Sequence, residues 1–257
     1  MRPMGTVTLC NRNMRVGAYI DGFNLYRGAR RLCGQGQPGW RWLDVRALIE
    51  DSFSADWRSR GAILDRVVYC TARVSGLRDP TSPRDQDVYI RAMKANGSID
   101  AVEFGNFVSR VKYAPLAVKR PSGKPELVRP TWPIQVQDGS SGSRHSEAVF
   151  IASYLRQEEK ASDVNVATHL LLDVLREDVE AAVVVSNDSD LKLPIREARQ
   201  RVPVGLINPG DGHLAGGLKG EASEGAGGHW WVSLDASRYT AHQLPDPVNG
   251  LSKPIGW

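Results

Sequence analysis

Two short apolar runs that each end in aspartate most constrain what this chain can fold into. Residues 16–20 read Val-Gly-Ala-Tyr-Ile and lead into Asp21, while residues 181–186 read Ala-Ala-Val-Val-Val-Ser and lead into Asn187-Asp188-Ser189-Asp190. Runs this short and this apolar are typical of strands buried on both faces, as in parallel sheets. Both runs are therefore predicted to be central strands that deliver acidic residues at their carboxyl ends.

The rest of the chain alternates between strand-like and helix-like patterns. Further strands are predicted at 64–74, 99–108 and 202–208, and helices at 23–32, 40–53, 82–96, 163–176 and 191–200. Strands that alternate with helices pair in parallel and are covered on both faces. The predicted fold is α/β, a doubly wound, mainly parallel central sheet flanked by helices.

Composition shifts divide the chain into a folded domain and extensions. Residues 1–13 are predicted to be a disordered extension, and the domain is expected over 14–208, with a loop insertion at 119–145 that holds four prolines and a Gly/Ser cluster. Long loops within compact domains are often functional. Residues 209–257 are predicted to be a Gly-rich linker and a tail that packs on the domain, because Trp230, Trp231 and Trp257 favour burial.

Charge and cysteine content restrict the class of protein without naming it. The net charge of +4 permits a nucleic-acid partner but does not demand one. The three cysteines are scattered and odd in number, which argues against a disulfide framework and favours a reducing, cytoplasmic compartment. No apolar run approaches the roughly 18 residues of a membrane span, so no membrane association is expected.

The acidic residues at the strand ends predict a metal site. Ligands of such sheets bind at the carboxyl ends of the strands, so Asp21 and Asp188 are expected to meet at one edge. Carboxylates gathered there repel one another unless a proton or a cation compensates. Ligand sets made only of oxygen suit Mg²⁺ or Mn²⁺, and no His/Cys cluster competes for zinc.

Each aspartate also has a purely structural alternative. Asp-Gly at 21–22 is a common turn pair, and aspartate before a helix is a common N-cap. Asp190 is the residue expected to share metal binding with capping of the helix at 191. Asp163, at the start of its helix, is the third candidate, and Asp173 a supporting one, since about 80° of helical rotation separates the two.

Three segments resemble the NYN branch of the PIN-like nucleases, which includes the LabA-like (DUF88) proteins. They are Tyr-Ile-Asp-Gly-Phe-Asn-Leu-Tyr at 19–26, Lys-Ala-Ser-Asp-Val at 160–164 and Val-Val-Ser-Asn-Asp-Ser-Asp-Leu at 184–191. Their order and spacing match that family over roughly residues 15–208. Asn187 stands where the family often has glycine, and Leu191 where phenylalanine is frequent.

The resemblance implies a metal-dependent endoribonuclease that hydrolyses RNA. The family's catalytic and metal-binding aspartates map onto Asp21, Asp163, Asp188 and Asp190. Asn24 matches an asparagine that orients the site, and Ser186 matches the small hydroxyl residue before the last two aspartates. The candidates for binding substrate are basic and aromatic side chains: Arg27, Arg30, Arg31, Lys119, Arg120, Lys124, Arg129 and Trp132.

Other functions stay open at this point. An aspartyl-phosphate phosphatase would place a second aspartate at position 23, which is Phe23 here. A nuclease acting on DNA, or a catalytically weak RNA-binding module of the same fold, would share most of these residues. A dinucleotide site is disfavoured because no Gly-x-Gly-x-x-Gly follows the first strand. The sequence does not decide between a monomer and a homo-oligomer.

Overall fold

The computed structural model describes residues 13–76 and 79–257, and the chain divides into two units. The first unit contains the described residues up to Asn106 together with Glu159–Trp257, and the second is Phe107–Glu158. The predicted extension at 1–13 lies, apart from Asn13, outside the described residues. None of the helices in the described ranges is both long and apolar enough to cross a membrane.

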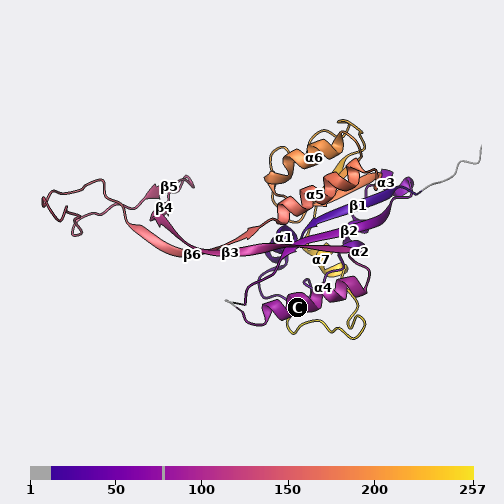
Figure 1. The fold of residues 1–257 in the computed structure, drawn as a ribbon, viewed down its shortest axis with the longest axis horizontal. Helices are drawn as coiled ribbons and strands as arrows, with labels where there is room; N and C mark the ends of the chain where they lie inside the picture. The colour runs from indigo at the N-terminus through magenta and orange to yellow at the C-terminus, as the bar shows by residue number, and fades with distance from the viewer. Residues whose placement is uncertain (1–12, 77–78) are drawn as a thin grey trace, which may run out of the picture. The chain divides into compact units, whose positions relative to one another are not determined.

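A seven-stranded sheet forms the centre of the fold, with the order β6-β3-β2-β1-β7-β8-β9 (Figure 1). Its strands are β1 (Arg15–Asp21), β2 (Ile63–Ala72), β3 (Ala101–Pro115), β6 (Ile151–Lys160), β7 (Ala181–Val185), β8 (Val204–Asn208) and β9 (Trp230–Ser233). Neighbouring strands run parallel from β3 through to β9. The predicted α/β, doubly wound and mainly parallel sheet is confirmed.

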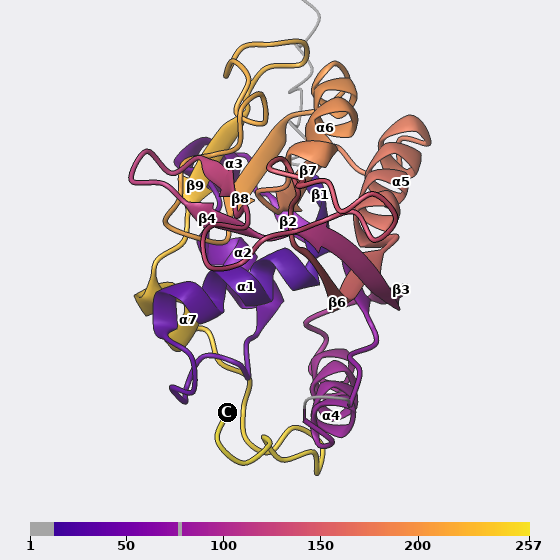
Figure 2. The same ribbon diagram turned by 90° about the vertical axis from the view of Figure 1, so that its left-hand side faces the viewer.

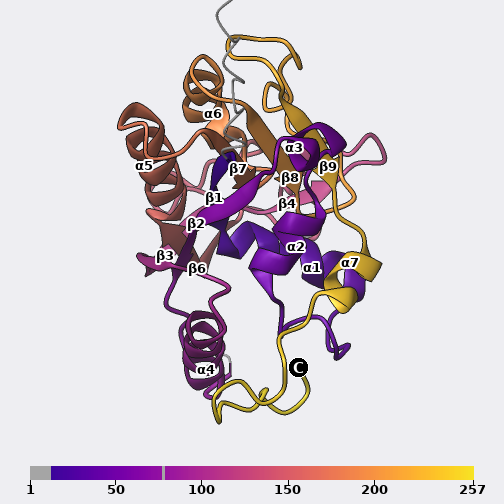
Figure 3. The same cartoon turned by 90° about the vertical axis from the view of Figure 1, so that its right-hand side faces the viewer.

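Helices cover both faces of the sheet in the first unit. They are α1 (Gly22–Cys33), α2 (Val45–Asp51), α3 (Ala55–Ser59), α4 (Ser82–Ala95), α5 (Ser162–Leu175), α6 (Lys192–Arg199) and α7 (Ala236–Ala241). Helices α5 and α6 lie on one side of the strands, and α1, α2 and α7 lie on the other (Figures 2 and 3).

Successive side chains of β1 enter two different apolar cores, which is why this strand is apolar throughout. Val16, Ala18 and Ile20 pack with the side chains of α1, α2 and α7, while Tyr19 packs with those of α5 and α6. All four are fully buried. A strand buried on both faces has no solvent-facing position, so its sequence shows no polar alternation.

The carboxyl-terminal residues add two elements that the sequence analysis did not predict. Strand β9 extends the sheet beyond β8, and α7 packs beside α1. The aromatic residues of this part have partners: the Trp230 ring lies 5.3 Å from that of Trp57, and the Trp257 ring lies 5.6 Å from that of Tyr89. Residues 209–257 thus belong to the first unit and take part in its sheet and core.

Two predicted boundaries differ from the structure by five residues or more. The helix expected at 40–53 begins only at Val45, because Asp44 caps it by accepting a hydrogen bond from the Ala47 N–H, and Leu43 instead bridges to Gln243. The strand expected at 99–108 continues to Pro115. Its extra length belongs to the second unit.

The second unit is larger than the loop expected at 119–145 and has strands of its own. It runs from Phe107 to Glu158 and contains the antiparallel pair β4 (Ala117–Lys119) and β5 (Pro125–Leu127), in addition to the paired ends of β3 and β6. Large apolar side chains are well exposed along it, including Tyr113 and Trp132 at 74% and 84%. The prolines and glycines on which the prediction was based therefore cover only the middle of the second unit.

A close approach of α1 to the end of β8 yields a test of this packing. A Cβ built on Gly28 would lie 2.3 Å from the Pro209 carbonyl oxygen, which also accepts a hydrogen bond from the Tyr239 hydroxyl. Gly28→Ala is expected to lower the free energy of unfolding by about 2 kcal/mol, as overpacking does, although alanine favours helix by about 1 kcal/mol. Urea unfolding measures the change.

Gly212→Ala is the matched control for that substitution, since a Cβ there meets no atom within 4 Å. It should leave the unfolding midpoint nearly unchanged. Equal midpoints for Gly28→Ala and the native chain would show that α1 does not pack against Pro209 in this way.

Candidate active site at the carboxyl edge of the sheet

The strand register brings the predicted acidic segments to one edge. Asp21 lies opposite Cys70 of β2, and Ile20 lies opposite Val185 of β7. The carboxyl ends of β1, β2 and β7 are therefore level. Asp188 follows β7 by three residues and stands at the same edge.

Asp21 is a buried carboxylate at the end of the central strand, with a side chain only 4% exposed. Its Oδ1 accepts hydrogen bonds from the N–H groups of Phe23 and Asn24, at 3.2 and 2.9 Å, and so caps α1. Burial raises the pKa of Asp21 to about 6, against the lowering effect of the hydrogen bonds from Asn24 and Ser186. The aspartate thus has a structural role as a cap and also an unusual affinity for protons.

Two hydrogen-bond links join Asp21 and α1 to the turn after β7. The Ser186 hydroxyl donates to Asp21 Oδ2 at 3.1 Å and accepts a hydrogen bond from the Asp188 N–H at 3.1 Å. Asn24 Oδ1 accepts a hydrogen bond from the Asn187 N–H at 3.1 Å. Asn24 and Ser186 therefore fix the position of the turn that carries Asp188.

The capping role expected of Asp190 belongs instead to Asp188. Asp188 is the N-cap of the 3₁₀ turn η1 (Ser189–Leu191), and its Oδ1 accepts a hydrogen bond from the Asp190 N–H at 3.0 Å. Asp190 is exposed at the surface of this turn. The reason is that η1, which contains Asp190, precedes α6, so the first helical turn after β7 begins at Ser189, directly after Asp188.

Asp163 joins this group from the start of α5. Helix α5 begins at Ser162, directly after Ala161 with its left-handed φ of 79°. This turn packs tightly against β3, where a Cβ on Gly105 would lie 2.2 Å from the Lys160 carbonyl oxygen. Burial, and after it the charges of Asp21, Asp188 and Asp190, raise the pKa of Asp163 to about 6. The predicted aspartates therefore interact electrostatically.

Glu159 belongs to the same group and was missed in the sequence. Its charge raises the pKa of Asp21, and burial followed by the charge of Asp163 raises its own pKa. Its carboxylate accepts a hydrogen bond from the Ser162 hydroxyl. Glu159 stands near the end of β6, so it is a strand-end carboxylate like Asp21. Because β6 itself was not predicted, nothing distinguished this glutamate from others.

Asp173 lies in a separate network. Its buried carboxylate accepts a hydrogen bond from the Tyr19 hydroxyl at 2.9 Å, and its Oδ2 lies 2.9 Å from Arg66 Nε in an ion pair. Asp173 therefore neutralises an arginine and satisfies a core tyrosine. The structure does not bring this supporting candidate together with the four predicted aspartates.

The chemistry of the cluster suits a divalent cation, although its side chains are not arranged as ligands of one. Within residues 13–76 and 79–257, Asp21 contacts no cationic side chain, and no three Asp, Glu, His or Cys side chains are spaced to hold one ion. Carboxylates that raise one another's pKa bind a proton or a cation favourably. Asp21, Asp163, Asp188 and Asp190 provide only oxygen donors, which Mg²⁺ and Mn²⁺ prefer.

The predicted substrate-binding arginines of α1 differ in their distance from the cluster. The Arg27 guanidinium lies 4.2 Å from the centre of the Phe23 ring, and its charge lowers the pKa of Glu159. Arg30 and Arg31 lie in the last turn of α1. The rise of about 1.5 Å per residue puts them about 12 Å along the axis from the start of the helix. Only Arg27 is adjacent to the carboxylates.

The other predicted substrate-binding residues belong to the second unit. Lys119, Lys124 and Trp132 are exposed, whereas Arg120 pairs with Glu126 and Arg129 pairs with Glu147. Residues 107–158 contain eight Lys and Arg and four Asp and Glu. Their excess of four positive charges equals the net charge of +4 of the whole chain. The first unit, which holds the acidic cluster, is therefore formally neutral over the rest of the sequence.

Comparisons with known proteins found a curated relative and a match to a solved structure. No family model matches the chain. The chain is 26% identical over 266 residues to 6-hydroxy-3-succinoylpyridine 3-monooxygenase HspA of Pseudomonas putida, an enzyme, and the match covers 95% of this chain and 75% of that one. A protein of unknown function from Vibrio parahaemolyticus superposes with a TM-score of 0.42 at 15% identity, covering 90% of this chain and 97% of the other.

The raised pKa of Asp21 predicts a specific pH dependence of stability. Because the folded state holds this proton more tightly than the unfolded state, the contribution of Asp21 to the free energy of unfolding should fall as pH rises from about 4 to about 6. Asp21→Asn removes this cost of ionisation. Its stability relative to the native chain should therefore improve over that pH range, by at most about 3 kcal/mol at about 1.4 kcal/mol per pKa unit.

Urea unfolding at several pH values, with chelator present, measures this difference. The matched control is Asp65→Asn, which removes an exposed carboxylate near the amino-terminal end of β2, at the opposite edge of the sheet. A stability difference between Asp21→Asn and the native chain that stays constant across this pH range would show that Asp21 ionises freely.

Proposed function

We propose that this chain is a metal-dependent endoribonuclease whose active site is the carboxylate cluster at the carboxyl edge of the sheet. The observation that carries the proposal is the burial of Asp21, with its raised pKa, beside Asp163, Asp188 and Glu159. Burying carboxylates that repel one another costs stability, and titratable groups with strongly shifted pKa values cluster at functional sites. The resemblance to the NYN nucleases in three ordered segments supplies the reaction class.

In this proposal Asp21, Asp188 and one or both of Asp163 and Asp190 hold Mg²⁺ or Mn²⁺. When bound, the ion supplies Lewis acidity and positive charge to a phosphodiester. Ser186 and Asn24 hold Asp21 and the Asp188 turn in fixed positions through the hydrogen bonds described above. That fixed geometry lowers the reorganisation needed as charge develops.

Glu159 is the proposed proton carrier of the site. Burial raises the pKa of this half-buried carboxylate, which makes it a stronger proton acceptor than a free glutamate. The neighbouring Ser162 hydroxyl donates a hydrogen bond that orients it. The charge of Arg27 opposes this rise in the pKa of Glu159.

The choice of RNA as substrate rests on the resemblance and on charge. The second unit carries the chain's net positive charge together with exposed Trp132 and Tyr113, a combination suited to single strands through phosphate contacts and base stacking. The first unit, which is formally neutral, would supply the catalytic residues, and the second unit would supply most of the electrostatic attraction for the RNA backbone.

Substitution of the strand-end aspartates tests the proposed activity. Asp21→Asn and Asp188→Asn are each expected to reduce Mn²⁺-dependent cleavage of unstructured RNA by at least about 10³-fold, since each removes charge that the reaction needs. Asp65→Asn, on the opposite edge of the sheet, should cleave like the native chain. Gel analysis of an end-labelled RNA, with and without chelator, and with DNA of the same sequence, measures all of these.

A retained rate in both aspartate variants would contradict the metal-site assignment. Full activity in chelator would contradict metal dependence. Equal cleavage of the matched DNA would redirect the proposal to a general nuclease.

A second candidate function comes from the curated relative, whose name specifies monooxygenation of a substituted pyridine. The match spans almost the whole chain, which favours testing this activity directly. Such a reaction would insert one oxygen atom of O₂ into the ring and reduce the other to water with two electrons from a reduced nicotinamide. Substrate-dependent consumption of O₂ and of the reduced nicotinamide, absent in heat-inactivated protein, would support it over the nuclease.

A further inference from the structure

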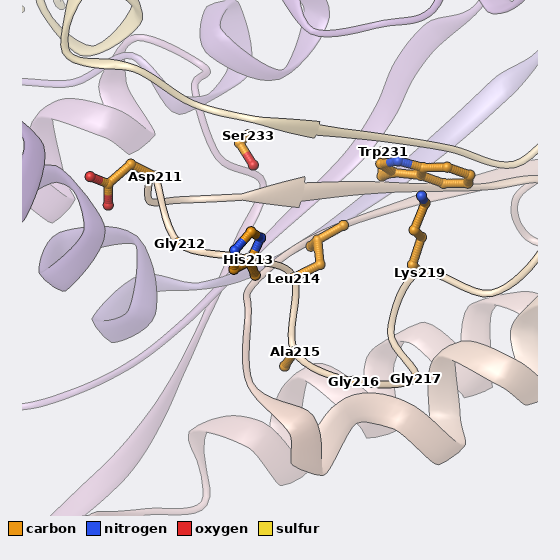
Figure 4. Close-up of a pocket in the computed structure, with 10 residues that line it drawn as sticks. All are labelled: Asp211, Gly212, His213, Leu214, Ala215, Gly216, Gly217, Lys219, Trp231 and Ser233. Carbon is orange, nitrogen blue, oxygen red and sulfur yellow. The ribbon is translucent and has the colours of Figure 1, made fainter. Parts of the chain in front are cut away.

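The Gly-rich segment after β8 forms one wall of a pocket beside the carboxylate cluster. The pocket has a volume of about 480 Å³, within the usual range for small ligands. Its lining consists of residues 211–217 and 219 together with Trp231 and Ser233 of β9 (Figure 4). The glycines lie between an acidic end at Asp211 and a basic end at Lys219.

The Asn187 side chain attaches this wall to the acidic turn. Its Oδ1 accepts a hydrogen bond from the Ala215 N–H at 2.7 Å, and its Nδ2 donates to the His213 carbonyl at 3.1 Å. The Asn187 backbone N–H is at the same time bound to Asn24. One residue therefore joins the pocket loop to the chain immediately before Asp188.

Two lysine side chains supply positive charge at the basic end of the pocket. Lys219 Nζ lies 4.6 Å from the centre of the Trp231 ring, so an aromatic face holds the ammonium in place. The Lys192 side chain also reaches the loop, since a Cβ on Gly217 would lie 2.8 Å from Lys192 Nζ. In the part of the chain that the structure describes, neither lysine forms an ion pair.

The loop backbone adds hydrogen-bond donors at this end. Among the described residues, the N–H groups of Gly216 and Gly217 have no acceptor. Gly217 has a left-handed φ of 86°, a backbone conformation that other residues rarely adopt. Consecutive free N–H groups with ammonium groups beside them are a typical setting for phosphate oxygens.

From these contacts we infer that the pocket is a subsite for one unpaired nucleotide of the substrate strand, next to the scissile bond. Lys219, Lys192 and the glycine N–H groups would bind its phosphate, and the Trp231 indole would provide an apolar wall for its base. This inference deepens the proposed function and rests on it for the identity of the polymer. It assigns a role to a segment that lies outside the family resemblance.

A pair of substitutions at one glycine tests the subsite without disturbing the fold. A Cβ on Gly216 meets no atom within 4 Å, and its φ is not left-handed. Gly216→Glu therefore introduces a negative charge into the pocket, while Gly216→Ala is the neutral control. Lys219→Gln removes the ammonium, Lys219→Arg retains a cation, and Lys94→Gln removes an exposed lysine of α4.

Binding of fluorescein-labelled oligouridylate is measured by anisotropy over a series of salt concentrations. All variants are made in the Asp21→Asn chain, so that cleavage does not interfere. Gly216→Glu and Lys219→Gln are expected to weaken binding about 5-fold to 10-fold. Lys219→Gln should also reduce the slope of log K against log salt by about 0.7, the value for one phosphate contact of a single strand.

Lys94→Gln should bind like the parent. Gly216→Ala, which keeps the backbone N–H, and Lys219→Arg, which keeps a cation, should bind more tightly than Gly216→Glu and Lys219→Gln. Equal affinity and slope in all five variants, or no binding by the parent, would overturn the subsite. Displacement of the RNA by 6-hydroxy-3-succinoylpyridine in the parent would reassign the pocket to the second candidate function. The two proposals can also fail separately. If the variants bind as expected but the native chain does not cleave RNA, the nuclease proposal is wrong and the subsite is supported.

Discussion

The arrangement of the site depends on one buried carboxylate at the end of the central strand. Asp21 accepts hydrogen bonds from two N–H groups at the start of α1 and from the Ser186 hydroxyl after β7. It therefore joins the strand that bears it, the following helix and the neighbouring strand. A negative charge at a helix amino terminus is favourable, but burial and the nearby carboxylates oppose it. Asp21 therefore stabilises the start of α1 as its N-cap. Its buried negative charge also favours the binding of a proton or a cation at the carboxyl edge of the sheet.

Most of this sheet edge could be predicted because its signals are local. An apolar run and the aspartate after it are adjacent in sequence, and parallel pairing makes the ends of such runs neighbours. Asp21 and Asp188 follow from those two facts. Asp163 needed the family resemblance, because a helix-start aspartate alone is an ordinary surface charge. The structure then shows its interaction with the others through its raised pKa.

Residues whose roles depend on distant contacts could not be predicted in the same way. Asp173 lies on the same helix as Asp163, but its partners Tyr19 and Arg66 belong to β1 and β2, which are distant in sequence. Glu159 becomes part of the site only because β6 returns beside β3 and turns sharply at Ala161. The short strand β9 is too brief, and too close to glycines, to show a strand pattern. In each case long-range packing decided the structure.

The difference from the family pattern at Asn187 has a structural explanation. A glycine there would keep the backbone N–H that binds Asn24 but would lose the side chain that holds His213 and Ala215. The loop of residues 211–217 is mostly exposed, and Asn208 Nδ2 also holds it by donating to the Gly212 carbonyl oxygen at 2.7 Å. Asn187 thus connects two parts of the chain. One is the acidic turn, which lies within the segments that resemble the NYN family, and the other is the glycine-rich wall of the pocket, which lies outside them. A ligand that orders the loop would act on the position of Asp188 through this one side chain, and the metal site would in turn influence the pocket.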